Sequence, residues 1–360
     1  MPAYKAGGPI QSIAALIENF NEGISYKIFC GDTDLDGSVL SMQRDQWVPF
    51  NDYTQVWYAS KNDLSRRLTD EIESVKPGVL FIIGIFSWHY NIVPLLFGKA
   101  NKKILSVRGM LHPGALTQKK YKKRLFLTAI KLTGIHKKIT FHATDADEAQ
   151  YIKNEFGGDV NICVAGNFGR VIKREEPLYK KEGVLQLITI ALISPMKNHL
   201  AVLKALEKCT GNIEYNIYGP VKDMAYWQLC LQQINQLPGN IKVLYHGEAV
   251  PDEIPQLLAH NHVFIMPSKS ENFGHAIFEA LSAGLPVITS HATPWNDLIA
   301  NKAGMNVSPE ESELKDAIEF FSAITNENYA EFSKNASSYI LQRTDKENLR
   351  KQYTNMFSGN

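Results

Sequence analysis

The segment 268–288 constrains the fold of this chain more than any other stretch. An apolar run, Val263 to Met266, leads into it, and Gly274 opens an apolar helical stretch. Gly284 ends that stretch, and a new apolar run begins at Pro286. This order of strand, loop, helix and strand is typical of an α/β unit with a parallel sheet, in which ligands bind at the carboxyl ends of the strands.

Two carboxylates flank the start of the predicted helix. Glu279 lies inside the apolar helix, where burying a carboxylate without a hydrogen-bonding partner is costly. Glu271 lies eight positions earlier, in the preceding loop, and the N–H groups of Phe273, Gly274 and His275 can face a diphosphate. The spacing suits a sugar nucleotide, with Glu279 accepting hydrogen bonds from ribose hydroxyls and Glu271 meeting the sugar or the turn beneath it. The alternative is two surface glutamates near a helix N-terminus, where acidic residues are favoured.

The whole segment, S-K-S-E-N-F-G-H-A-I-F-E-A-L-S-A-G-L-P-V-I, resembles the E-x7-E signature of the retaining glycosyltransferases of family 4, including the A-x-G-x-P-V that follows. The resemblance is specific at this motif and continues more weakly, in order, over most of the chain. It implies an α/β chain of two facing Rossmann-like domains (the GT-B fold), with the active site in the interdomain cleft. It also implies Glu271 as a catalytic residue and Asn272 as part of the donor site.

The length of 360 residues fits two domains, and short apolar runs alternate with helical stretches in two series. In the first series we expect strands at 25–30, 56–59, 79–85, 103–107, 138–142 and 161–164, and helices at 10–20, 63–74, 92–99, 119–132 and 145–156. In the second we expect strands at 185–191, 214–218, 242–245, 263–266 and 287–289, and helices at 199–208, 224–234, 253–259 and 274–283. The domains are then an N-terminal acceptor-side unit over 1–170, a linker over 171–183, a nucleotide-sugar-binding unit over 184–340, and a helix over 341–360 that crosses back to the first unit.

The beginning of the chain departs from this pattern. A domain of this family normally begins with an apolar strand and a glycine-rich loop, but here Met1 is followed almost at once by P-A-Y-K-A-G-G-P, which looks like that loop. Either the chain starts late or another segment fills the central position of the first sheet. Gly7 and Gly8 allow a ligand close to the backbone, and the resemblance implies Gly8 beside the donor phosphates and Gly7 on the acceptor side. A plain loop is the alternative.

The segment 194–198, S-P-M-K-N, follows the first strand of the second series. It resembles the segment in which family members hold the donor diphosphate with an Arg and a Lys. Lys197 matches the Lys, with Ser194 beside it, and a solvated loop lysine is the alternative. The Arg position falls on Leu192, or on Ala191 if the loop is one residue shorter, so one phosphate clamp is missing.

Other strand ends supply further candidates. The family places the nucleotide base near the loop that contains Gly247 and Val250, although an ordinary turn is equally compatible. Arg108 follows a strand where many members carry His-Gly near the reacting sugar, so we expect a catalytic contribution from it. An arginine cannot act as a base but can bind phosphate or sugar hydroxyls. His89 and His112 are expected on the acceptor side, as structural or substrate-positioning residues.

A metal site is not expected. The run D-T-D-L-D-G over 32–37 matches half of a calcium loop and contains D-x-D, but the twelfth loop position is Gln43 and a strand precedes the run. An Asp-rich turn is the better account. Lys197 and the helix N-terminus would then stabilise the departing diphosphate without a metal or other cofactor.

Charge and composition limit the kinds of partner that the chain can have. Residues 1–170 carry 21 Lys and Arg against 16 Asp and Glu, whereas the remainder carries 17 against 21. The stretch 118–138 predicts a basic amphipathic helix that can lie on an anionic membrane; a solvated helix face is the alternative, and the two are compatible. No nucleic-acid recognition motif, transmembrane run or signal peptide is present, and the four cysteines are scattered without metal-ligand spacing. We therefore expect a cytoplasmic protein, with a peripheral position on the inner face of the membrane.

Together these features predict a transferase. It would move a sugar from a nucleoside diphosphate sugar to a hydroxyl of a glycan or lipid-linked acceptor, with retention and without a metal, in the biosynthesis of a surface polysaccharide such as lipopolysaccharide. Two alternatives remain open. One is a non-catalytic nucleotide-sugar-binding subunit, favoured by Leu192, Arg108 and the missing strand, and the other is a nucleotide-sugar epimerase of the same fold. Release of free nucleoside diphosphate, binding without turnover, and interconversion of the sugar distinguish the three.

Overall fold

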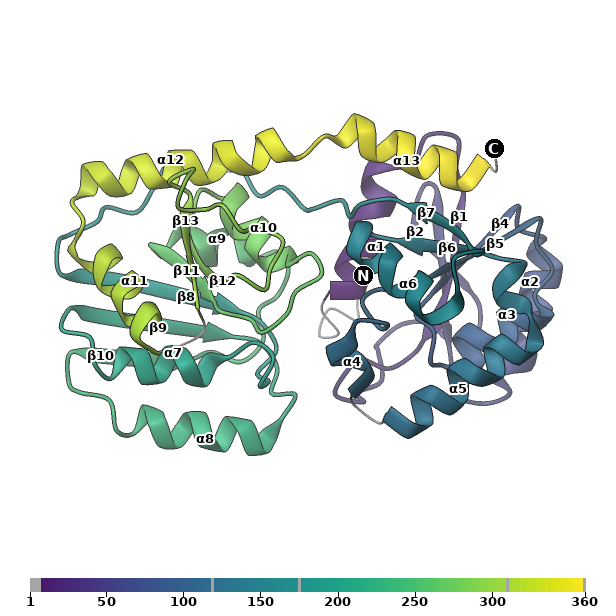
Figure 1. Cartoon of the computed structure of the whole chain (residues 1–360), viewed down its shortest axis with the longest axis horizontal. Helices are drawn as coiled ribbons and strands as arrows, with labels where there is room; N and C mark the ends of the chain where they lie inside the picture. The colour runs from purple at the N-terminus through teal and green to yellow at the C-terminus, as the bar shows by residue number, and fades with distance from the viewer. Residues whose placement is uncertain (1–7, 118–119, 174–175, 309–310, 359–360) are drawn as a thin grey trace. The chain divides into compact units, whose positions relative to one another are not determined.

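The computed structural model describes residues 8–117, 120–173, 176–308 and 311–358, which form two compact units. Of the described residues, the N-terminal unit comprises those within 13–168 and 346–358, and the C-terminal unit comprises those within 8–12 and 169–345. The main division falls at Phe168, two residues before the expected boundary, and a second division falls at Ser12, within the first helix. Figure 1 labels the elements of both units.

The C-terminal unit alternates strands and helices over 184–290 as the sequence predicts, and it has one further strand, over 304–307, that the sequence analysis did not predict. Its strands are β8 (Val184–Ile190), β9 (Asn212–Tyr218), β10 (Ile241–Tyr245), β11 (Val263–Met266), β12 (Val287–Ser290) and β13 (Gly304–Val307). Its helices are α7 (His199–Leu206), α8 (Met224–Ile234), α9 (Ile254–Ala259), α10 (His275–Ser282), α11 (Glu311–Ala323) and α12 (Asn326–Arg343). Among the described residues these strands form one parallel sheet in the order β10-β9-β8-β11-β12-β13.

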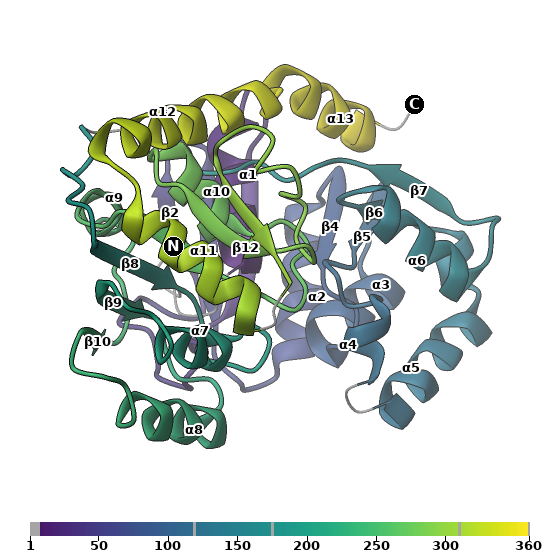
Figure 2. The same cartoon turned by 60° about the vertical axis from the view of Figure 1, so that its left-hand side comes forward.

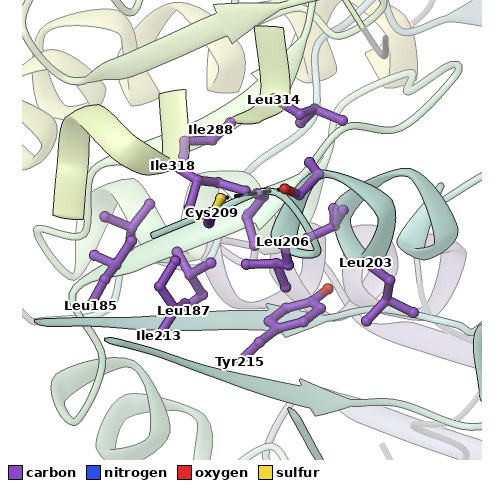
Figure 3. Close-up of a cluster of buried hydrophobic side chains, with 14 of the residues drawn as sticks. Leu185, Leu187, Leu203, Leu206, Cys209, Ile213, Tyr215, Ile288, Leu314 and Ile318 are labelled. Atoms are coloured by element: carbon purple, nitrogen blue, oxygen red, sulfur yellow. Dashed lines mark hydrogen bonds between the residues drawn. The ribbon is translucent and has the colours of Figure 1, made fainter. Parts of the chain in front are cut away.

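Both faces of this sheet are buried, because successive side chains of a strand point to opposite faces. Leu187 of β8 packs on the side covered by α7, α8 and α11, whereas its neighbour Ile188 packs on the side covered by α9, α10 and α12. Figures 1 and 2 show α12 running along the side of the sheet that α10 covers. Figure 3 shows the first of these clusters, in which side chains of α7 and α11 meet those of the sheet. The labelled members are Leu185, Leu187, Leu203, Leu206, Cys209, Ile213, Tyr215, Ile288, Leu314 and Ile318.

The N-terminal unit contains more irregular elements. Its strands are β1 (Tyr26–Gly31), β2 (Trp47–Asn51), β3 (Thr54–Ala59), β4 (Val79–Ile83), β5 (Lys102–Ser106), β6 (Thr140–Ala143) and β7 (Asn161–Val164). Its helices are α1 (Gly8–Asn19), α2 (Leu64–Val75), the π-helix η2 (Trp88–Ile92), α3 (Val93–Phe97), α4 (Pro113–Thr117), α5 (Lys120–Thr133), the 3-10 helix η3 (Ile135–Lys137), α6 (Ala146–Phe156) and α13 (Lys346–Ser358).

The strands of this unit fall into two sheets instead of one. In the described part of the chain, one sheet has the order β1-β3-β2 and the other has the order β4-β5-β6-β7. The sequence leaves open whether another segment fills the central position of the first sheet, and no described segment pairs with the second edge of β1 or of β4. The backbone N–H and C=O groups along those two edges therefore lack ladder partners among the described strands, which is costly unless they are otherwise satisfied.

The last helix belongs to the core of this unit. Tyr353 and Met356 of α13 are buried with Ile104 of β5 and Phe168, on one face of the four-stranded sheet. On the opposite face, side chains of α3, α5 and α6 form a second cluster. Residues 346–358 thus stabilise the N-terminal unit although they are its most distant part in sequence.

Two further features, at Gly8 and at Trp88, differ from the sequence expectations, whereas the turn at 32–37 and the free cysteines are as expected. Gly8 is the first residue of α1 and not part of a loop, and Gly7 lies outside the described residues. The expected helix over 92–99 begins as a π-turn at Trp88, with Asn91 bonded to the Ser87 N–H and the Ile83 carbonyl. The run 32–37 forms a turn in which the Asp34 N–H donates to the Ser38 carbonyl at 2.9 Å, and the four cysteines are free thiols.

No helix in the described ranges has both the length and the apolar character needed to cross a bilayer. Within the same ranges, no cluster of three or more His, Cys, Asp or Glu side chains is arranged to hold a metal ion.

Candidate active site

The site follows from the order of the strands in the C-terminal unit. The chain builds outward from β8 through β9 to β10, then returns to the other side of β8 and continues through β11, β12 and β13. The connections after β8 and β11 therefore diverge at the carboxyl ends of two adjacent strands, where α/β sheets bind ligands. The first connection contains Lys197, and the second contains Glu271.

These two connections are bonded to each other. The Lys269 N–H donates to the Met196 carbonyl at 2.9 Å, and the Lys197 ammonium forms an ion pair with the Glu271 carboxylate. Both side chains of this pair are largely buried, with 21% and 11% exposed. The Glu271 N–H is held by the Ala292 carbonyl at 3.0 Å, so the carboxylate is fixed from its own backbone. Two residues that the sequence proposes separately thus form one ion pair.

Ser194 anchors the first connection. It is buried, and its carbonyl accepts a hydrogen bond from the Lys197 N–H at 3.0 Å. Asn198 then takes a left-handed conformation, with φ of 63°, immediately before α7. This tight turn fixes the position from which Lys197 extends toward Glu271.

The start of α10 is suited to an anion. Gly274 has φ of 76°, and a Cβ at that position would lie 3.2 Å from Ile277 Cδ1 and 3.4 Å from Trp295 Nε1, so a glycine is strongly favoured there. Trp295 Nε1 donates to the Phe273 carbonyl at 2.7 Å and holds the loop in place. The N–H groups of Phe273 and Gly274 donate no hydrogen bond to any described residue. Together with those of the following turn, which begins at His275, they form a helix N-terminus that can accept negative charge.

Glu279 lies on the same helix and is 6% exposed. Its carboxylate receives no hydrogen bond from any described residue, and burial raises its pKa to about 7, an effect that the Arg170 guanidinium opposes. A buried carboxyl group without an internal partner is unusual, because the group keeps its desolvation cost without compensation. A ligand hydroxyl that donates to Glu279 would supply the missing hydrogen bond.

Arg170 is a site residue that the sequence analysis missed. Its Nη1 donates to the Pro251 carbonyl at 3.0 Å, and its charge acts on Glu279, so it links α10 to the loop after β10. The preceding Gly169 allows this approach, since a Cβ there would lie 2.5 Å from the Phe278 ring. The signal in the sequence was a glycine followed by an arginine directly before the predicted linker.

The loop after β10 contains two further donor-site candidates. The Gly247 carbonyl accepts a hydrogen bond from the Gly219 N–H at 2.6 Å, so the loops that follow β9 and β10 are joined. Val250 is 42% exposed, and its carbonyl accepts from the Glu253 N–H at 2.9 Å. The structure therefore places Gly247 and Val250 at the same carboxyl edge of the sheet as Lys197 and Glu271.

His199 is a second residue that the sequence analysis did not single out. It is the first residue of α7 and fully buried, and neither ring nitrogen has a hydrogen-bond partner among the described residues. Burial, and then the nearby charge of Lys197, lowers its pKa to about 3. An uncharged ring at this position leaves Lys197 as the cation of this loop.

Arg108 lies in the N-terminal unit, directly after β5, in a left-handed conformation with φ of 48°. Its Nη1 donates to Asn167 Oδ1, whereas Nε and Nη2 are buried and have no hydrogen-bond partner in the described part of the chain. Burial, and then the charge of Arg108, lowers the pKa of His142 to about 3. That imidazole is held between Ser106 Oγ and the Ala165 carbonyl, both at 2.8 Å, so it has a structural role.

The two histidines expected on the acceptor side lie on separate elements of the N-terminal unit. His89 is exposed on η2, with its Nδ1 2.6 Å from Ser65 Oγ. His112 accepts a hydrogen bond from the Gly114 N–H at 3.1 Å, and its ring packs edge-on against Tyr151. No hydrogen bond or ion pair between described residues joins Arg108, His89 and His112 into one cluster.

The C-terminal unit resembles a known protein family. Residues 172–339 match the family described as Glycosyl transferases group 1. The Escherichia coli O-antigen chain mannosyltransferase B is 31% identical over 129 residues, which cover 34% of this chain and 32% of that protein. The Arabidopsis thaliana sulfoquinovosyl transferase SQD2 is 35% identical over 68 residues, 19% of this chain and 13% of that protein. The alignments thus span a third or less of the length of these relatives.

Solved structures match over a much larger part of the chain. HepE (Alr3699) of Anabaena, crystallised in complex with UDP and glucose, has a TM-score of 0.65 at 18% identity, with 85% of this chain and 86% of that chain covered. Sucrose-phosphate synthase from Thermosynechococcus elongatus has a TM-score of 0.71 at 15% identity, with 97% and 90% covered. The chain has the GT-B fold of glycosyltransferases. The expected fold class is confirmed, and the matched segment 172–339 contains Lys197, Glu271 and Glu279.

Proposed function

We propose that this GT-B chain is a retaining glycosyltransferase of family 4, which moves a sugar from a nucleoside diphosphate sugar to a hydroxyl of a glycan or lipid-linked acceptor. The observation that carries the proposal is the group at the switch point of the C-terminal sheet. Lys197 is paired with Glu271, next to the start of a helix where the N–H groups of Phe273 and Gly274 donate to no described residue, and that helix carries the buried carboxyl of Glu279. A cation and a helix N-terminus suit a diphosphate, and an unpaired buried carboxyl suits a ribose hydroxyl.

The donor contacts follow from this arrangement. The diphosphate would take the N–H groups of Phe273, Gly274 and His275 and share the Lys197 ammonium with Glu271. Ser194, Asn272 and the loop of Gly247 and Val250 would line the remainder of the nucleotide, and Gly8 would lie beside the phosphates. The family similarity over 172–339 supports a donor of this class.

The reaction needs no proton acceptor other than the donor itself. The bond between the sugar C1 and the diphosphate oxygen breaks, and its electron pair leaves with the diphosphate. The acceptor oxygen forms a bond to C1 on the same face, and its proton passes to the departing phosphate oxygen. Lys197 and the helix N-terminus stabilise the charge that develops on the diphosphate, so a metal ion is not required.

The acceptor is proposed to be a growing surface glycan, such as the chain of a lipopolysaccharide, at the cytoplasmic face of the membrane. The name of the Escherichia coli relative, an O-antigen chain mannosyltransferase, supports this class of product. Arg108, in the N-terminal unit, would contribute to catalysis by binding phosphate or sugar hydroxyls. His89 and His112 of the same unit would serve the acceptor, as would Gly7, which lies outside the described residues.

Turnover with a panel of UDP-, GDP- and ADP-sugars tests the proposal. Purified protein is mixed with each donor and with acceptor glycans, and free nucleoside diphosphate and extended glycan are quantified together. Equal release of both products with one donor, lost in Lys197→Met and retained in Lys204→Met, is the expected result. Lys204 is the matched control because it is an exposed lysine on α7. Binding without release, or interconversion of the sugar without release, would contradict the proposal.

A further inference from the structure

The N-terminal unit contains one long segment that is basic and has no acidic residue. Residues 74–144 contain 13 Lys and Arg and no Asp or Glu, so the rest of the chain carries a net charge of −12 in a protein of net charge +1. The helix α5, Lys120–Thr133, lies in this acid-free segment and carries five of these cations. Figures 1 and 2 show α5 on the outside of its unit.

The helix is apolar on two opposite faces. Leu127 and Ile130 are buried and pack into the core of the N-terminal unit. Tyr121, Leu125 and Leu132 are 88%, 74% and 83% exposed, and their spacing of four and seven residues places them on one face of a helix. One apolar face is sufficient to attach a helix to its own sheet, so the second face requires another explanation.

The cations beside this outer face are not used within the protein. Lys120, Lys122 and Arg124 are exposed, and none of them has an ion pair or hydrogen bond with another described residue. By contrast, Lys131 pairs with Glu155 at 2.6 Å, and Lys123 donates to the Ala115 carbonyl at 2.7 Å. Three unpaired cations therefore flank an apolar stripe on the same helix.

We propose that the outer face of α5 docks on an anionic lipid bilayer. The aromatic and aliphatic side chains of Tyr121, Leu125 and Leu132 enter the boundary between headgroups and acyl chains, while Lys120, Lys122 and Arg124 contact the anionic headgroups. The helix lies in the plane of the surface, since its 14 residues are too few to span a bilayer. This surface would hold the protein where a lipid-linked acceptor is found. The role in reaching the acceptor rests on the proposed function, whereas binding to vesicles does not depend on sugar transfer.

A lipid surface fits these observations better than an acidic macromolecule. Nucleic acid or an acidic protein would use the cations but would leave exposed leucines beside charged partners. A bilayer satisfies both chemistries at once, because its anionic headgroups lie directly above hydrocarbon. Binding should therefore need both the charge and the apolar stripe.

The test is co-sedimentation of the full chain with vesicles. We expect binding to vesicles of phosphatidylglycerol and phosphatidylcholine, and little binding to phosphatidylcholine alone. Leu125→Gln should weaken binding roughly tenfold, since a buried leucine is lost from the apolar boundary, and Lys122→Gln should weaken it about fivefold. Ile299→Gln and Lys61→Gln are the matched controls, because both residues are exposed and lie on other elements.

Three outcomes would overturn the proposal: no binding to anionic vesicles, equal loss in the control variants, or tighter binding to a polyanion such as heparin that is insensitive to Leu125→Gln. The affinity of each variant for nucleoside diphosphate is measured in parallel. Unchanged nucleotide affinity with lost vesicle binding separates a failure of α5 from a failure of the donor site.

Discussion

Replacing Glu279 by Gln should make the protein more stable and less able to bind its donor. The substitution keeps the size of the side chain and removes only its ability to ionise. Glu279 is 6% exposed on α10, and burial raises its pKa to about 7 from an ordinary value near 4.5. The folded protein therefore favours the neutral carboxyl, and the ionised form at higher pH costs stability.

The magnitude follows from the shift in pKa. Between pH 4.5 and 7 the folded state keeps a proton that the unfolded state has released, so the free energy of unfolding falls as the pH rises. At about 1.4 kcal/mol for each pKa unit, the wild-type protein loses about 3 kcal/mol across this window. Glu279→Gln has no such loss. Its stability relative to wild type should therefore be about 3 kcal/mol more favourable at pH 8 than at pH 4.

Urea unfolding of both proteins at several pH values measures this difference in stability. The unfolding is followed by hydrogen exchange of peptides from α10, so that only the C-terminal unit is observed. Calorimetry with the preferred nucleoside diphosphate sugar measures the function. We expect a roughly 10- to 100-fold loss of affinity at pH 8, because a neutral amide replaces a charged acceptor of a ribose hydroxyl. A stability difference that does not change with pH, or an unchanged affinity, would refute the reasoning.

Three other results are expected. Activity should persist in excess EDTA, because Lys197 and the start of α10 stabilise the diphosphate; loss of activity that manganese or magnesium restores would contradict this. Lys197→Met should weaken nucleoside diphosphate binding by roughly 10- to 100-fold in calorimetry, as expected for loss of a charged hydrogen bond, whereas Lys204→Met should not. Hydrogen exchange should show β1 and β4 opening at lower free energy than β8 and β11, since each has an edge without a described strand partner; equal protection of the two units would oppose it.

The strands β8 to β12 of the C-terminal unit were predictable because parallel strands buried on both faces are continuous apolar runs, whereas β13, with the sequence G-M-N-V, is not such a run and was not predicted. Val263–Met266 is such a run, and its bounds in the structure are the predicted ones. The glycine that begins α10 was equally visible, since Gly274 takes a positive φ that other residues avoid. Local chemistry was sufficient for both features.

The N-terminal unit was less predictable, because its irregular elements depend on tertiary contacts. β2 contains Pro49, which argues against a strand, yet among the described strands β2 pairs only with β3, and such an edge position tolerates a missing N–H group. The π-turn at Trp88 depends on Asn91, whose side chain satisfies the Ser87 N–H and the Ile83 carbonyl. Neither hydrogen bond has a signature in the local residue pattern.

Contacts between distant residues explain the remaining differences in the site. The sequence proposed Lys197 and Glu271 individually, but their ion pair joins positions 74 residues apart. The sequence analysis placed Arg108 correctly after a strand. The hydrogen bond from its guanidinium to Asn167 could not be predicted from the residues around either position. Arg170 was overlooked because its importance comes from Glu279 and Pro251, neither of which is near it in sequence.

The two carboxylates of the E-x7-E pattern look equivalent in sequence, but their surroundings differ. Glu271 is held from its backbone by Ala292 and forms an ion pair with Lys197, so its charge is already matched within the protein. Glu279 is buried without a hydrogen bond from any described residue, and its pKa near 7 leaves it poised between neutral and charged forms. A diphosphate that shares Lys197 must disturb the first carboxylate, whereas a ribose hydroxyl satisfies the second. Donor binding would therefore favour the ionised form of Glu279 and weaken as the pH falls below 7, which gives the second carboxylate the role of sensing an occupied nucleotide site.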